Sequence, residues 1–507
     1  MKKSVITTIT IGILALGGIG GGLFLQNRTE QLIQNEIARI SAPFPGLERA
    51  SCDDVRVSFL QRTVAISNLR LSGPKGELRC RELVLRPAFS AMLAAGVPSL
   101  RSLLLPDSGP VVMGDMEARD MATHAVLPIL PQMPDSPTHT LEAELATLTL
   151  VAVQLDGRHF AALLNGDTPP LRDVAGQSGA ALMDAARIRL RRVEPIPSTL
   201  TMERLRLRDV VTGPGAALLE IERLSDVDAD TEKSWARLRL TEISIPPTVL
   251  DAIALNGLFS FDELTQALAE SGENLCRTLT MEDGKFAFPP SPAESTCVVK
   301  RVFIESRDTP QYFQIQLDRL RIAPYLALPK DGPLSIPGIA MLQLDFSWKH
   351  EQRGRLFRED VSLSAADMGR LTIELEHDFD FYNLSSDADL LSLPGARLGK
   401  GFLRYEDEGG IGRMLAARIR DRKELPQVDA LAAQLSALFP GRSNQGLVDA
   451  LRTTLLTPGT LELRLRDDMR TTVFDLLASG EPGRRIDASA VPGKENVKEQ
   501  ILRFQIQ

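Results

Sequence analysis

One spacing of apolar residues recurs along this chain and limits what it can fold into. Its first copy is TVAISNLRLSG, Thr63 to Gly73, where Val64 and Ile66 alternate with polar residues, the pattern skips one residue, and Leu69 and Leu71 resume it. Further copies are Leu78, Cys80, Leu83 and Leu85; Leu148, Leu150, Val153 and Leu155; Leu238, Leu240, Ile243 and Ile245; Cys297, Val299, Val302 and Ile304; and Ile315, Leu317, Leu320 and Ile322, with near-matches starting at Ile188, Leu205 and Leu219.

Alternation with a period of two predicts antiparallel strands with one apolar face. The skipped residue would turn the second half of a strand to the wrong face unless a β-bulge restores the apolar side and bends the strand. Two short strands that meet at a kink are the alternative. We therefore expect a mainly β protein with helices, an α+β fold built on curved antiparallel sheets of repeated bulged strands.

The N-terminal segment predicts a membrane anchor. Lys2 and Lys3 precede an uncharged, mostly apolar run over 4–25, which is long enough to cross a bilayer as a helix. The lysines favour a cytoplasmic N-terminus, so that a single-pass protein of the bacterial inner membrane would hold its bulk in the periplasm. A cleaved signal peptide is the competing interpretation.

Composition and turn signals divide the remainder of the chain. We expect an anchor and exit helix over 1–40, the repeated β region over 41–330, a second β block over 331–404, an α+β region over 405–480 and a polar tail over 481–507. Short helices are predicted at 87–95 and 179–186, and amphipathic helices at 410–420, 428–439 and 445–456.

Four cysteines allow two local disulfides in an oxidising compartment, Cys52 with Cys80 and Cys276 with Cys297. The alternative is four small buried residues, because Cys80 and Cys297 both occupy apolar positions of the repeat.

No motif in the sequence indicates catalysis, a cofactor or a bound metal. The five histidines lack the spacing of metal ligands and are predicted to be surface or cap residues. A formal charge of −8 and a pI of about 5.5 argue against nucleic-acid binding. We therefore expect a protein that is not an enzyme.

The anchored start, the TVAISNLRLSG units and the strand–Pro–helix–strand order of Glu77 to Leu105 resemble the AsmA-like group of bacterial envelope proteins. The resemblance implies binding or movement of lipid along a curved, apolar β groove, with the membrane, phospholipid and other envelope proteins as partners. Candidate groove residues are Val64, Ile66, Leu69, Leu71, Leu148, Leu150, Val153 and Leu155.

An apolar sheet face must be covered by helices, by a second sheet or by a ligand. If the chain itself covers it completely, the protein is instead a non-catalytic scaffold or interaction module with a closed β core.

Overall fold

The computed structural model of the 507-residue chain is mainly β. It describes residues 49–58, 61–73, 76–91, 110–128, 138–158, 179–194, 197–211, 215–228, 232–244, 276–287, 297–308, 311–322, 341–379, 397–419, 422–465, 471–472 and 482–506, together with positions 161 and 339 and six helical positions within 30–37. The chain divides into two compact units, Met1–Leu279 and Thr280–Gln507.

The predicted membrane segment over 4–25 lies outside the described residues. None of the helices in the described part of the chain is long and apolar enough to span a bilayer.

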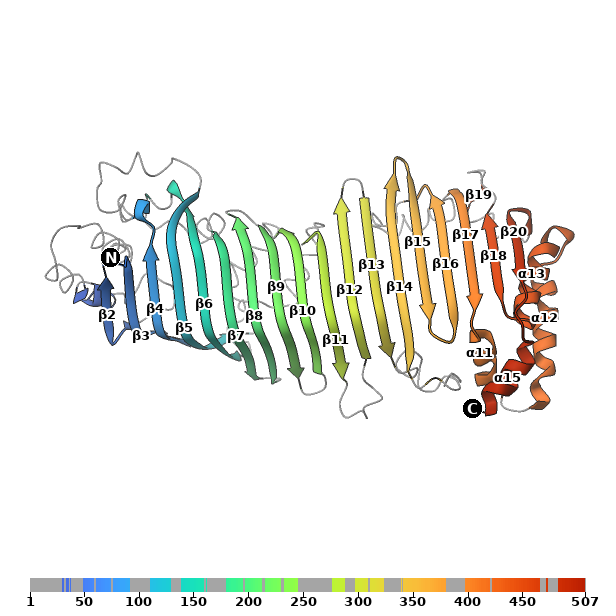
Figure 1. Ribbon diagram of the computed structural model, residues 1–507, viewed down its shortest axis with the longest axis horizontal. Helices are drawn as coiled ribbons and strands as arrows, with labels where there is room; N and C mark the ends of the chain where they lie inside the picture. Colours follow the sequence, from blue (N-terminus) through green and yellow to red (C-terminus); the bar gives the residue numbers. More distant parts are fainter. Residues whose placement is uncertain are drawn as a thin grey trace. The chain divides into compact units, whose positions relative to one another are not determined.

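Unit 1 is an antiparallel meander in which strands that are consecutive in the chain lie side by side (Figure 1). Two short strands, β1 and β2, pair with successive halves of β3 and form the first edge. The strands of this unit are β1 (Arg49–Ser51), β2 (Asp54–Ser58), β3 (Thr63–Gly73), β4 (Gly76–Pro87), β5 (Pro110–Pro128), β6 (Thr138–Asp156), β7 (Ala180–Glu194), β8 (Ser198–Val211), β9 (Gly215–Asp228) and β10 (Glu232–Ser244). The following strand, β11 (Thr278–Ala287), begins at the end of this unit.

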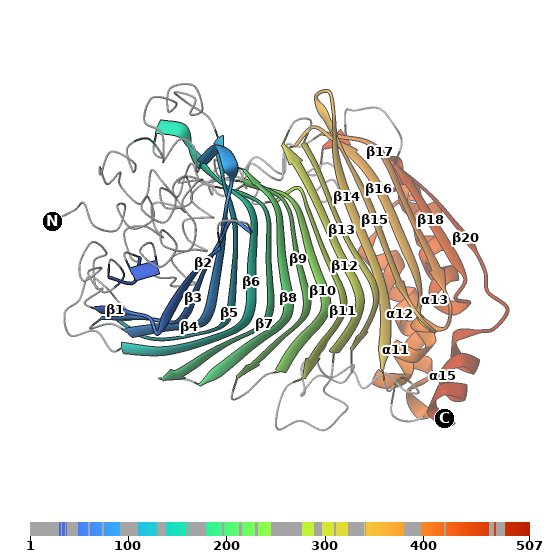
Figure 2. The same ribbon diagram turned by 60° about the vertical axis from the view of Figure 1, so that its left-hand side comes forward.

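In most copies of the repeat the skipped residue is a backbone kink, whereas the copies in β4 and β12 contain no left-handed residue. In β3 it is Asn68, which has a left-handed conformation with φ of 52°, and in β6 it is Ala152 with φ of 49°. The same conformation occurs at the second skipped position in other strands, at Asp120, Arg187, Asp209, Arg223, Glu242, Asp283 and Arg319. Non-glycine residues seldom adopt this conformation, so its recurrence at one position of the repeat is a property of the fold. The strands of unit 1 bend along their length (Figure 2).

The kinks of neighbouring strands are aligned across unit 1. Ser67 pairs with Glu82 and Leu69 with Cys80, so Asn68 lies opposite Arg81 without a shift in register. The first kink line continues through Asp120, Ala146, Arg187, Glu203, Arg223 and Ala236, and a second one runs through Ala152, Ala181, Asp209, Ala217 and Glu242. Along each line, left-handed residues occupy every second strand.

The predicted bent strand with one apolar face is confirmed, but a bulge is the wrong mechanism for most of these bends. A bulge sets two residues against one, whereas here each strand contributes the same number of residues. Register shifts do occur at two kinks: at that of β13, between Leu317 and Leu320, and at that of β6, where Asp115 of β5 alone faces Val151 and Ala152. At two kinks an aspartate on an adjacent strand accepts the backbone N–H: Asp115 of β5 from Ala152, and Asp345 of β14 from Arg319.

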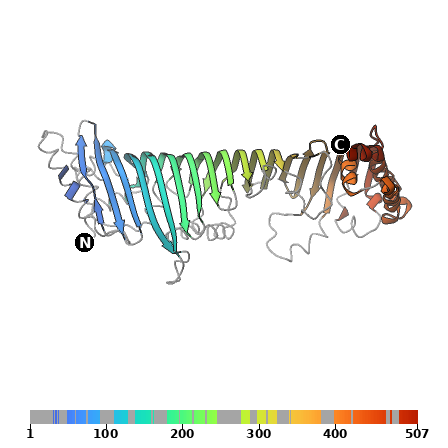
Figure 3. The same cartoon turned by 90° about the horizontal axis from the view of Figure 1, so that it is seen from below.

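In its described residues, unit 2 contains a second antiparallel meander and four α-helices. Its strands, after β11, are β12 (Cys297–Asp308), β13 (Gln311–Ile322), β14 (Leu342–Arg353), β15 (Leu356–Ala365), β16 (Gly369–His377), β17 (Arg397–Asp407), β18 (Thr460–Leu465), β19 (Thr471–Thr472) and β20 (Ile486–Val491). The helices are α11 (Gly410–Arg418), α12 (Pro426–Leu438), α13 (Gln445–Leu456) and α15 (Val497–Ile506). They gather at the end of this unit that holds β18 and β20, and α13 packs against both strands (Figure 3).

The predicted helices agree best with the structure in the C-terminal part of the chain. Helices α11, α12 and α13 lie close to the predicted segments. The helix expected over 179–186 is wrong, because Ala180 to Ala186 belong to strand β7. The prediction of a polar tail over 481–507 is also wrong. This segment contains β20 and α15, and the α15 side chains Ile501 and Phe504 are buried against α11.

Substitutions at Ala152 test the kink directly. Glycine should raise the free energy of unfolding by about 1 kcal/mol, because it relieves the left-handed strain, whereas valine should lower it. Ala122 is an exposed alanine on β5 outside the kinks. Here the order of stability should be the opposite, so that the valine variant has the higher free energy of unfolding. Urea unfolding of the four variants measures both orders. An identical ranking at the two positions would contradict the kink.

Candidate functional site

Two rows of apolar side chains run across unit 1, perpendicular to the strands. Each row takes one residue from every strand between β3 and β10, and successive members are paired neighbours. The first row is Ile66, Leu83, Ala118, Leu148, Ala185, Leu205, Ile221 and Leu238, and the second is Val64, Leu85, Met116, Leu150, Met183, Leu207, Leu219 and Leu240. No polar side chain interrupts either row.

From β6 to β10 the two kink lines run along these rows, one on each side. Between them lie five residues of each strand from β6 to β10, for example 147–151 in β6 and 204–208 in β8. At about 3.3 Å per residue this central panel is roughly 17 Å wide, and the rows, crossing eight strands about 4.8 Å apart, are roughly 34 Å long. Leu148 and Leu205, like most of the panel's apolar side chains, are only half-buried in the described structure.

The opposite face of the central panel is mostly polar, and many of its charges form ion pairs. Asp184 accepts hydrogen bonds from Arg204, and Arg206 lies 3.4 Å from Glu222. The hydrogen bond from Arg204 lowers the pKa of Asp184. The charged side chains of this face pair with one another and with solvent. An apolar ligand is therefore expected on the other face.

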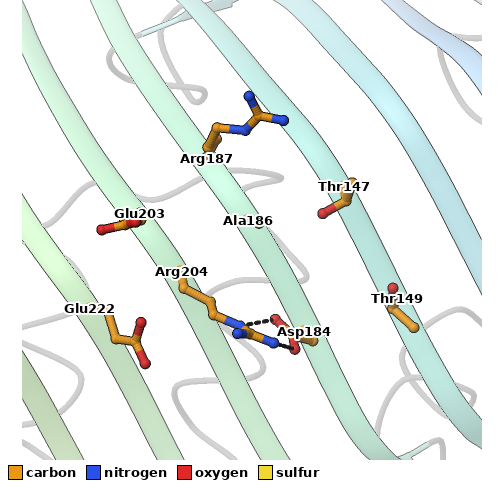
Figure 4. A pocket seen from close by; sticks show the side chains of 8 residues that line it. All are labelled: Thr147, Thr149, Asp184, Ala186, Arg187, Glu203, Arg204 and Glu222. Atoms are coloured by element: carbon orange, nitrogen blue, oxygen red, sulfur yellow. Dashed lines mark hydrogen bonds and ion pairs between the residues drawn. The ribbon is translucent and has the colours of Figure 1, made fainter.

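A shallow hollow of about 410 Å³ lies on this polar face (Figure 4). Small residues on β6 and β7 leave space between longer charged side chains, and the three carboxylates among these each have an arginine partner. The residues lining it are Thr147, Thr149, Asp184, Ala186, Arg187, Glu203, Arg204 and Glu222. We assign no ligand to this hollow.

The start of the apolar face, at β1 to β6, is covered by the chain itself. Ile33 and Ile37 of the helical segment 30–37, and Ala91, are at most 4% exposed and pack in one cluster with Val57 of the first edge. In Figure 2 the segment lies on the side toward which the neighbouring strands bend.

The structure separates the eight predicted groove residues into two environments. Val64, Ile66 and Leu155 are buried in this N-terminal cluster, and Leu69 and Leu71 are packed against it. The remaining three, Leu148, Leu150 and Val153, are half-buried on β6. The predicted residues of β3 therefore contribute to a protein core, while those in the middle of β6 belong to or adjoin the central panel.

All four cysteines carry free thiols, so neither local disulfide pair is formed in this structure. Cys80 is buried on β4 opposite Leu69, and Cys52, Cys276 and Cys297 are half-buried. Burial raises the pKa of the Cys80 thiol.

In unit 2 the apolar face contains a buried polar cluster that the sequence did not reveal. Glu359 on β15 accepts hydrogen bonds from Nδ1 of His350 at 2.5 Å, Nε2 of His377 at 3.2 Å and Nε1 of Trp348 at 2.6 Å. The ring of Phe357 stacks against both imidazoles, with centroids 5.2 and 5.8 Å apart. His350 and His377 are at most 1% exposed, so the prediction of surface histidines is wrong for these two.

The environment of Glu359 fixes its charge. Burial opposes ionisation of the carboxyl group, but the three hydrogen bonds outweigh this effect and lower the pKa of Glu359 to about 2. The groups belong to three adjacent strands, β14, β15 and β16, so the cluster connects them laterally. Within the described residues, no group of histidine, cysteine and acidic side chains is arranged to hold a metal ion.

Comparisons of the chain with protein-family models, with curated proteins and with solved structures found no match.

Replacing Glu359 by glutamine should lower the free energy of unfolding at pH 7 by about 2 kcal/mol, the scale of hydrogen bonds to a charged group. The ordinary pKa of a glutamate is 4.5, so the charged carboxylate stabilises the fold above pH 4.5 and loses its effect as the pH falls toward 2. The difference between wild type and E359Q should therefore shrink over that range in thermal unfolding.

Asp360→Asn is the matched control, because Asp360 is the next residue of β15 and is paired with Arg358 on the opposite face. It should change stability by less than about 1 kcal/mol. A constant difference between wild type and E359Q from pH 5 to pH 2 would show that the Glu359 charge does not stabilise the fold.

Proposed function

We propose that this protein binds the hydrocarbon chains of membrane lipids on the apolar face of unit 1. The observation that carries the proposal is the pair of uninterrupted apolar rows, sixteen positions from eight strands, whose middle part is half-exposed. A continuous apolar surface that the chain buries only in part is a candidate binding surface.

The shape and chemistry of the rows favour an acyl chain as the occupant. The backbone groups of the panel are engaged in the sheet, and its apolar face offers no polar side chain, so a ligand with polar groups along its length would lose hydrogen bonds there. A hydrocarbon chain has no hydrogen bonds to water and therefore loses none on binding. Each half-buried leucine that it covers contributes about 1 kcal/mol. The part of the rows on β6 to β10, five strands or roughly 19 Å, exceeds half the ~30 Å hydrocarbon thickness of a bilayer.

The second candidate function is a non-catalytic scaffold or protein-interaction module. It is favoured by the N-terminal cluster, where the same apolar face packs against helical side chains of the chain itself, including Ile33 and Ile37. A partner with an amphipathic helix would bind the central panel in the same manner.

The proposed setting follows from the sequence. A single-pass anchor would hold the sheet in the periplasm of a bacterial envelope, next to a source of phospholipid. The resemblance to AsmA-like envelope proteins supports a role in lipid binding or movement during envelope maintenance. Such a role needs no catalytic residue, no cofactor and no nucleic acid.

A photo-crosslinking amino acid at Leu205 tests the proposal in the full chain in its native membrane. We expect crosslinks to phospholipid at Leu205 and none at Arg206, its neighbour on β8 with the side chain on the polar face. Mass spectrometry of the purified, illuminated protein identifies the adduct. Crosslinks from Leu205 to another protein would favour the scaffold function, and equal lipid labelling at both positions would mean nonspecific contact.

A further inference from the structure

The helical segment 30–37 covers one end of the two apolar rows. Val64 and Ile66 are the members of the rows on β3, and both are buried, like their partners Val57 and Val55 on β2, in the cluster that contains Ile33 and Ile37. In the middle of the same rows, Leu148 and Leu150 are half-exposed. The segment and a bound hydrocarbon chain would therefore occupy one continuous surface.

The segment is also attached to the first edge of the sheet. The backbone N–H of Val57 on β2 donates a hydrogen bond of 2.8 Å to Oε1 of Glu30, and Nε2 of Gln34 donates one of 3.4 Å to the carbonyl oxygen of Asp53. β2 pairs with β3 on its other side. Side chains of the segment thus bind backbone groups that an edge strand would otherwise expose.

We propose that the segment 30–37 is a gate for the apolar face, an inference that depends on the proposed lipid binding. A chain lying along the rows reaches Val64 and Ile66 only when Ile33 and Ile37 leave them. A lipid acyl chain and the side chains of Ile33 and Ile37 make the same kind of apolar contact with Val64 and Ile66. The acyl chain and the isoleucines therefore compete for this surface. Lipid enters or leaves this end when the segment detaches from β2, and the end is closed when it is attached.

The attachment through Glu30 gives the sharpest test. In Glu30→Ala the bond to Val57 is lost, and detachment should become about fivefold more frequent, the factor that corresponds to one net hydrogen bond. The full-length protein is reconstituted in phosphatidylcholine vesicles, and loading is followed as the transfer of a fluorescent phosphatidylcholine to the protein. We expect faster loading by about the same factor. Ile33→Ser should act in the same direction.

Gln31→Ala is the matched control, because Gln31 is exposed on the same helical segment. It should leave the loading rate unchanged. The rate of thiol labelling at Cys52, which packs against the cluster, measures detachment without lipid and should rise in Glu30→Ala.

The outcomes separate the two proposals. Faster thiol labelling in Glu30→Ala together with faster loading supports the gate. Faster labelling with a loading rate equal to that of wild type overturns the gate and leaves lipid binding intact. Absence of loading in the wild-type protein as well overturns the proposed function itself.

Discussion

The structure of unit 1 depends on one constraint: a bent strand must keep its apolar residues on a single face. A regular strand satisfies this by strict alternation, but every residue added for a bend reverses the alternation. A left-handed residue such as Asn68 or Ala152 absorbs the extra position locally. The conformation costs roughly 1–2 kcal/mol for most residues, so it persists only where the surrounding strands enforce it.

Alignment of the kinks allows this constraint to be met in many strands at once. If each strand bent at a different position along its length, paired neighbours would need a register shift at every bend. Instead, Arg187 on β7 faces Glu203 on β8, and their strands bend together without a shift. Apolar rows on one face and charged rows such as Arg204 with Glu222 on the other follow from this alignment. The resulting segregation is what makes a long, purely apolar surface possible.

The sequence predicted the bent strands but not the register between them. The spacing located β3, β4, β6, β10, β12 and β13, whereas in β7 the near-match was placed at Ile188, just after the kink at Arg187. Alanines at 180, 181, 185 and 186 suggested a helix there, although pairing with β6 and β8 overrides that preference. The cluster around Glu359 was missed for a similar reason. Its histidines lie 27 positions apart (377 minus 350) and meet only through β15.

Residue type alone does not separate core from binding surface in this fold. Ile66 and Leu148 are both apolar residues of the repeat and belong to the same row, yet Ile66 is covered by the chain while Leu148 is only half-buried. The difference comes from segment 30–37, which is distant in sequence from most of the row. Since an apolar row accepts any hydrocarbon surface, coverage decides its role: where protein side chains cover it the row is core, and where they do not it is available to a ligand.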